Sequence, residues 1–186
     1  MIAERIGPCW TGDRGRALTR ISLDLCPMDL IVNWQRCSMT ADWVGRFVAQ
    51  EFPRAEHAFR EVSIVVNELL ENLVKFGADK RESLTLAVVN FGDVVRVDAT
   101  NRCHAAHVGP LRAQFQRLID GDPEALFLEQ IERTATGSDT DSGLGLLALA
   151  KDHREALGLQ VRSSSGGLWE VTVRAELSTR EMEGKA

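Results

Sequence analysis

The sequence has no apolar run long enough to cross a membrane, and its first residues lack the apolar segment of a signal peptide. Runs such as residues 64–66 hold only a few apolar side chains in a row, whereas a membrane-spanning helix needs about 20. The first ten residues include Glu4 and contain no continuous apolar stretch. These absences argue against a membrane or secreted protein and predict a cytoplasmic one.

A basic stripe is also missing. The chain has 22 Lys and Arg against 27 Asp and Glu, which gives a formal net charge of -5. Because proteins that bind nucleic acid gather positive charge on one face, nucleic acid is not expected as a partner. The composition that is present, 44% hydrophobic and 26% charged in 186 residues, suits a single globular domain with a core.

No C-x-x-C pair occurs among the four cysteines, which are Cys9, Cys26, Cys37 and Cys103. In a cytoplasmic chain of this size we expect free thiols. Cys103 stands close to His104 and His107, but a closed zinc site needs four ligands and no fourth is evident nearby. A metal-dependent hydrolase that combines this group with Glu68 is the weakest of the functional hypotheses.

Hydrophobic periodicity and turn residues predict the order of the elements. Strands are expected at residues 18–25, 83–91, 94–100, 157–163 and 168–177, and helices at 38–52, 57–76, 109–119, 122–134 and 144–157. Gly92 and Asp93 have the residue types of a hairpin turn. Because the strands come as neighbouring hairpins, we predict an α+β fold. It is a two-layer α/β sandwich in which a mixed, mostly antiparallel sheet carries helices on one face.

The helix at 38–52 has Thr40 as its predicted N-cap and places Trp43, Val44, Phe47 and Val48 on one face. The domain organisation is simple. Residues 1–17 are interpreted as an N-terminal extension, 18–177 as one domain with an insertion at about 102–142, and 178–186 as a charged tail.

Glu68 and Asn72 lie one turn apart on the polar side of the helix predicted at 57–76. An amide oxygen together with phosphate oxygens can hold Mg²⁺, and a carboxylate one turn away can deprotonate an attacking hydroxyl group. Glu71 and Lys75, also at i and i+4, have the spacing of an ordinary surface ion pair. From this helix alone the solvated face is the simpler interpretation, and a functional one requires a phosphate-binding segment elsewhere.

Such a segment is available where Gly143 and Gly145 flank Leu144 at the entry to a helix. Glycines let backbone N–H groups approach an anion closely, and a helix N-terminus favours negative charge. The alternative is that Ser142 or Asp141 caps the helix and the glycines only shape the turn.

The two motifs in this order resemble the Bergerat-fold (GHKL) ATPases, which include Hsp90, DNA gyrase B, MutL, histidine kinases and the anti-sigma-factor serine kinases. Glu68 and Asn72 match the E-x-x-x-N motif, and Gly143 and Gly145 match the second glycine box. Residues 68–77 are most similar to the anti-sigma-factor kinases, and the insertion is similar to that of the SiaB-type regulatory kinases. The resemblance covers roughly residues 18–177, and it makes the insertion an ATP lid.

The resemblance implies ATP and Mg²⁺ as cofactors and the phosphorylation of Ser or Thr on a small STAS-like antagonist protein. It places the chain in a bacterial partner-switching pathway, in which a phosphatase or a sigma-factor protein can also be a partner. Glu68 would be the catalytic base and Asn72 the Mg²⁺ ligand. Nucleotide contacts would come from Asn72, Lys75, Asn101, Ser142, Gly143, Leu144 and Gly145. The oligomeric state stays open, a homodimer included.

The family's first glycine box, D-x-G-x-G, is not matched. Asn101 stands where the resemblance places the aspartate that accepts a hydrogen bond from adenine, and both glycines are absent. An amide oxygen can still accept this bond, although less strongly than a carboxylate, and SiaB-type proteins are similar in carrying Asn there. Two functions therefore remain: a Mg-ATP-dependent protein kinase, and a non-catalytic docking module on the same scaffold with a degenerate nucleotide site.

Overall fold

The computed structural model describes residues 3–10, 14–135, 144–153, 156–180 and 182–184. Its centre is a six-stranded sheet in the order β1-β5-β6-β4-β3-β2. The strands are β1 (Glu4–Ile6), β2 (Thr19–Leu25), β3 (Leu84–Asn90), β4 (Val94–His104), β5 (Leu157–Ser163) and β6 (Leu168–Ser178). All five strand pairings formed by these elements are antiparallel.

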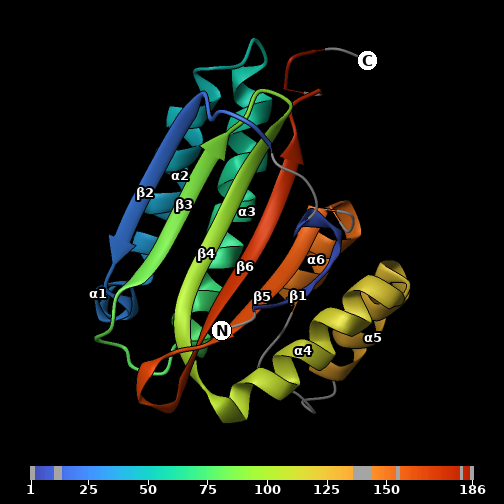
Figure 1. Ribbon diagram of the computed structural model, residues 1–186. Coiled ribbons are helices and arrows are strands. Elements are labelled where there is room, and N and C mark those ends of the chain that lie inside the picture. Colours follow the sequence, from blue (N-terminus) through green and yellow to red (C-terminus); the bar gives the residue numbers. More distant parts are fainter. Residues whose placement is uncertain (1–2, 11–13, 136–143, 154–155, 181, 185–186) are drawn as a thin grey trace.

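The helices form a second layer on one face of the sheet (Figure 1). This layer contains α2 (Gln35–Ala49), α3 (Ala55–Phe76) and α6 (Leu144–His153), with the short α1 (Pro27–Val32) at the β2 end. Two further helices, α4 (Ala105–Asp120) and α5 (Pro123–Ala135), lie beside the β1 end of the sheet. The predicted α+β sandwich, with its helices on one face, is confirmed. None of the helices in the described part of the chain has the length and apolar character needed to cross a membrane.

The long helix α3 is the main helical part of the core. Its buried positions recur at helical spacing and lie between the sheet and α2; they are Ala58, Val62, Ser63, Val65, Val66, Leu69, Leu70, Leu73 and Val74. Full burial of one such Val or Leu contributes about 1.5–3 kcal/mol. The helix ends at Gly77, whose N–H donates to Leu73 O over 3.1 Å. The predicted helix at 57–76 is therefore confirmed, with its start two residues earlier.

The hairpin between β3 and β4 turns at the predicted Gly92-Asp93 pair. Gly92 has φ +98°, a region that L side chains rarely adopt. The side chain of Asn90 stabilises the turn, because its Oδ1 accepts from Gly92 N over 2.7 Å. This hairpin sets the register in which β4 continues as far as His104.

Several elements differ from the predictions. Residues 4–6 form β1 and pair with β5, although the N-terminal residues were interpreted as an irregular extension. The strand β4 continues to His104, beyond its predicted end at residue 100, so the insertion begins only at α4. Near the C-terminus, Met182 is buried and its carbonyl accepts from Arg54 N, so the charged tail is anchored to the domain.

The helix α2 also departs from its prediction. It begins at Gln35, and Thr40 is not its N-cap, because the Thr40 hydroxyl donates to Arg36 O inside the helix. Val44 and Val48 are buried, as their spacing suggested, whereas Trp43 and Phe47 are exposed. The apolar residues of α2 cover a wider part of its surface than the part that packs against the domain, so the outermost of them remain exposed.

Candidate functional site

The polar side of α3 meets the N-terminus of α6. A Cβ atom built on Gly145 would collide with Oε2 of Glu68, so this carboxylate lies directly against the first turn of α6. A negative charge at a helix N-terminus is favourable. The site residues Glu68 and Gly145, 77 positions apart in the sequence, are thus brought together by the fold.

Glu68 is half-buried and its acid–base properties are altered. Burial raises the pKa of its carboxyl group above the ordinary value, and the nearby charge of Glu71 raises it further, while Lys75 acts in the opposite direction. A carboxylate with a raised pKa is a better proton acceptor than a fully solvated one. The structure therefore places a carboxyl group with a raised pKa at the contact between α3 and α6.

Asn72 lies one turn further along α3 and is half-buried. Its Nδ2 donates to Glu68 O over 2.8 Å, which holds the amide against its own helix. The amide oxygen is then the end that can serve as a ligand for a hard cation. Lys75, another expected site residue, is exposed, and its charge acts on Glu68.

Asn101 is buried in β4 and contacts α3. Its Nδ2 donates to Leu73 O over 3.0 Å, and the same carbonyl accepts from Gly77 N. Since the amide nitrogen is used in this way, the amide oxygen is the group that can accept from a ligand. The side chain therefore closes the last turn of α3 and also borders a cavity.

The cavity beside Asn101 has a volume of about 140 Å³ and is mostly apolar. It is lined by Phe76, Asn101, Cys103, His107, Pro110, Leu111, Gln114 and Val171. A second cavity of about 460 Å³ shares Phe76, Pro110 and Gln114 with it and continues between α4 and α5 to Leu147 of α6. Phe76, at the end of α3, lines both cavities. Together they connect the β4 position of Asn101 with the flank of α6.

Helix α4 supplies residues of this cavity that the sequence interpretation did not single out. Pro110 lies inside α4, which starts four residues before the predicted helix. The signal that could have indicated this wall is the apolar spacing of Leu111, Phe115 and Leu118, of which Phe115 and Leu118 are buried. Their spacing shows that α4 has a buried face, but not which cavity that face closes.

Two expected site residues, Ser142 and Gly143, lie outside the described residues. Leu144 is the first residue of α6. Among the residues that the structure does describe, no three His, Cys, Asp or Glu side chains are grouped so that they could hold a metal ion. Cys103 is buried, which raises its pKa, while His104 and His107 are exposed.

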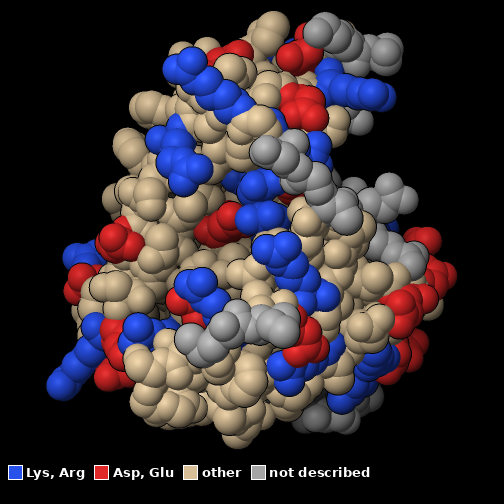
Figure 2. Space-filling view, viewed as in Figure 1, with Lys and Arg blue, Asp and Glu red and all other residues tan. Residues whose placement is uncertain are grey.

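The open face of the sheet carries a separate set of charges (Figure 2). Arg174 on β6 binds Asp98 on β4 through two hydrogen bonds of 2.6 and 2.8 Å. Glu176 accepts from both Arg14 and Arg96 and is largely buried by them. Because each positive charge in this set faces a carboxylate, the set does not offer an unpaired positive site for an anion.

Comparison with known proteins supports the fold. No protein-family model matches the chain, and no curated protein matches it in sequence. A chain in the crystal structure of the SiaB-SiaC complex from Pseudomonas aeruginosa superimposes with a TM-score of 0.57. The two share 19% sequence identity over 88% of this chain and 92% of that one. The chain therefore has a SiaB-like α+β fold.

Proposed function

We propose that the protein binds Mg-ATP and phosphorylates a serine or threonine of a small STAS-like partner protein, as a regulator in a bacterial partner-switching pathway. The observation that carries the proposal is the contact between Glu68 and Gly145, since it joins the E-x-x-x-N helix to the glycine-bearing helix start. The similarity of the fold to a chain of the SiaB-SiaC complex is consistent with a protein partner.

The residues present fit the chemistry of a nucleotide. The cavity beside Asn101 offers apolar walls for a base and one amide oxygen that can accept from an amino group. The N-terminus of α6 suits phosphate oxygens. Glu68 occupies the space next to Gly145, so its carboxylate would have to turn aside when a phosphate group approaches.

Bound ATP would supply the phosphoryl group, and Mg²⁺ would neutralise the charge that develops on its oxygens. Asn72 would hold the cation through its amide oxygen. Glu68 would accept the proton from the hydroxyl group of the partner's serine or threonine, and its raised pKa suits this role. Leu144 and Gly145 would contact phosphates through their backbone N–H groups.

Calorimetric or thermal-shift titration with ATP and Mg²⁺ tests the proposal. A ligand at one hundred times its dissociation constant raises apparent stability by about 2.7 kcal/mol. We expect a shift with wild type, a reduced shift with Asn72→Ala, and retained binding without phosphoryl transfer with Glu68→Gln. Asp42→Asn, which neutralises an exposed carboxylate on α2, is the matched control and should behave as wild type.

The second candidate is a docking module without catalysis. It is favoured by the small volume of the cavity beside Asn101 and by the use of the Asn101 amide in closing α3. It predicts no thermal shift at millimolar Mg-ATP together with intact binding of the partner protein. Co-purification of the partner, followed by a phosphorylation assay on it, separates the two candidates.

A further inference from the structure

The two edges of the sheet differ in how they are protected. At one edge, β1 has only three residues, and Arg112 of α4 binds Glu4. At the other, β2 has seven residues and pairs only with β3 among the described strands. Figure 1 shows β2 at the free margin of the sheet, away from α4 and α5. At the open edge of such a strand, every second residue directs its backbone N–H and C=O groups away from β3, without a partner strand.

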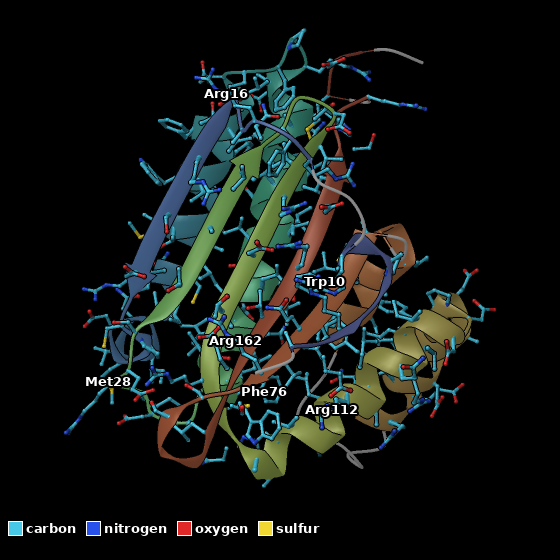
Figure 3. All side chains as sticks on the ribbon, in the orientation of Figure 1. Trp10, Arg16, Met28, Phe76, Arg112 and Arg162 are labelled. Atoms are coloured by element: carbon cyan, nitrogen blue, oxygen red, sulfur yellow. The ribbon has the colours of Figure 1, made fainter. Side chains whose placement is uncertain are left out.

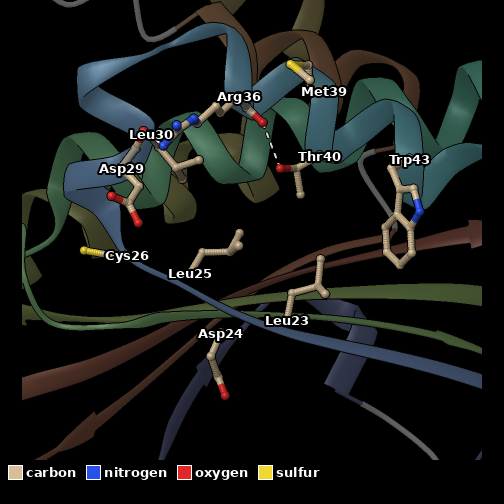
Figure 4. A pocket seen from close by; sticks show the side chains of 10 residues that line it. All are labelled: Leu23, Asp24, Leu25, Cys26, Asp29, Leu30, Arg36, Met39, Thr40 and Trp43. Carbon is tan, nitrogen blue, oxygen red and sulfur yellow. Dashed lines mark hydrogen bonds between the residues drawn. The ribbon is translucent and has the colours of Figure 1, made fainter.

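An apolar surface borders this open edge. It consists of Leu23 and Leu25 on β2 and Met39, Trp43 and Phe47 on α2, and we call it the β2–α2 surface. Met39, Trp43 and Phe47 follow one another at i, i+4 and i+8 and are 63%, 53% and 48% exposed. A groove of about 460 Å³ lies between the strand and the helix. Figure 4 shows Leu23 and Leu25 pointing from β2 toward α2, with the Trp43 ring above the strand.

The other face of β2 carries charges of opposite sign. Arg20 and Asp24 are exposed on the open face of the sheet, with Ser22 midway between them. In Figure 4, Asp24 points away from the groove. The strand is therefore apolar on its helix side and has one positive and one negative charge, equally spaced from its centre, on the other side.

We propose that β2 pairs antiparallel with β2 of a second copy of this chain, with Ser22 opposite Ser22 of that copy. This register uses all seven residues of β2 and places Arg20 opposite Asp24 of the second copy. Because the pair is two-fold symmetric, Asp24 also lies opposite Arg20 of the second copy, so the interface contains two such ion pairs. A shift by two residues in either direction loses these pairs and shortens the ladder. A shift by one residue would bring the apolar face opposite the charged one.

The apolar side of the strand fits the same arrangement. Ile21 would lie opposite Leu23 of the second copy, and the two β2–α2 surfaces would cover each other next to the joined strands. An extended segment of another protein could also add to this edge. The self-complementary charge pattern favours a second copy, because a symmetric strand pair needs opposite charges at equal distances from its centre.

Sedimentation equilibrium of single and mixed variants tests this dimer. Arg20→Asp and Asp24→Arg each place like charges opposite one another twice, so each alone should weaken dimerisation about tenfold or more. A mixture of these two variants restores both opposite-charge pairs and should form the dimer again, as should the double variant. Arg5→Asp, the same charge reversal in the opposite edge strand, is the control and should leave the dimer intact.

Trp43→Ser should also weaken the dimer without unfolding the chain, because the indole is half exposed. Circular dichroism of each variant checks the fold. A wild-type chain that remains monomeric at high micromolar concentration would overturn the proposal, and so would single variants that dimerise as well as wild type. The proposal would also be wrong if the chain stayed monomeric and bound only a different protein through the β2–α2 surface. None of these outcomes depends on nucleotide binding.

Discussion

Asn101 connects the stability of the fold to the candidate site. The resemblance to Bergerat ATPases leads one to expect an aspartate at this position, yet the structure gives the amide a use that a carboxylate lacks. Its nitrogen donates to Leu73 O in the last turn of α3. A carboxylate at the same place would bring negative charge against that carbonyl, in a buried position.

Asn101→Asp is therefore expected to lower the free energy of unfolding by about 1–3 kcal/mol. The substitution removes the N–H group that donates to Leu73 O and places a carboxylate oxygen against this carbonyl oxygen. Chemical denaturation at neutral pH measures the effect. Asn90→Asp is an informative control: that amide donates to the carboxylate of Glu51, so its replacement should also destabilise, but without changing ligand binding at the cavity. An Asn101→Asp variant as stable as wild type would contradict the capping role.

Glu68 contributes a pH dependence of defined sign. Because burial raises its pKa in the folded state, the ionised carboxylate is less favourable there than in the unfolded chain. The folded state is favoured by this group below the unfolded pKa, and that contribution is lost as pH rises through the folded pKa.

Glu68→Gln should therefore raise Tm at pH 7–8, and the gain should shrink toward zero as pH falls below about 4, near and below the ordinary pKa of glutamate. Thermal unfolding of both proteins across this range measures the difference. The exposed-site variant Asp42→Asn should stay within about 0.5 kcal/mol of wild type throughout. A Glu68→Gln effect that grows at low pH would show that the sign is wrong.

The C-terminus of α3 is closed by a lysine that follows the helix. Lys80 Nζ donates to the carbonyl groups of Val74, Lys75 and Gly77, the last two over 3.0 and 3.2 Å. Positive charge at a helix C-terminus is favourable, and these carbonyls have no partner within the helix. Burial lowers the pKa of Lys80, so desolvation offsets part of the gain.

Lys80→Met keeps the apolar stem and removes the three hydrogen bonds. We expect a loss of about 1–2 kcal/mol in the free energy of unfolding, or roughly 2–8 °C in Tm for a chain of this size. Arg81→Met, at an exposed position in the same turn, should have little effect. Equal Tm values for the two variants would exclude the capping role.

Residues 4–10 pack against the sheet. Trp10 lies over the open face of the sheet near β5 and β6 (Figure 3), with its ring centroid 4.2 Å from the Arg174 guanidinium. Its Nε1 donates to Ile6 O, which joins it to β1. Gly158 on β5 lies directly beneath, and a Cβ there would collide with Cys9 Sγ and Trp10 Nε1.

Gly158→Ala should therefore displace the segment at residues 4–10 and cost about 1–3 kcal/mol. Cys9, whose pKa burial raises to about 12, should then become open to alkylation in the folded protein. Tm, limited proteolysis and thiol labelling measure the change. Gly109→Ala is the matched control: nothing lies within 4 Å of an added Cβ there, and the helix should be stabilised by up to about 1 kcal/mol.

The long α3 and the strands from β2 to β6 could be predicted from sequence, because their patterns are local. Apolar spacing and turn residues such as Gly92 express preferences of the backbone over a few neighbours. β1 escaped prediction because three residues carry no period and gain their stability from pairing with β5. The N-terminus of α2 was placed wrongly for a similar reason, since Thr40 suits either a cap or a helix interior.

The amino-acid sequence alone determined the fold class, the order of the main elements and the pairing of Glu68 with Asn72 on one helix face, since these depend on local periodicity. Only the tertiary structure decided that Glu68 meets Gly145, that Asn101 closes α3 beside a cavity, and that Trp43 stays exposed. Those facts depend on how helices pack on the sheet and on strand register. Contacts between distant residues arise from the packing of whole elements, which no short stretch of sequence encodes.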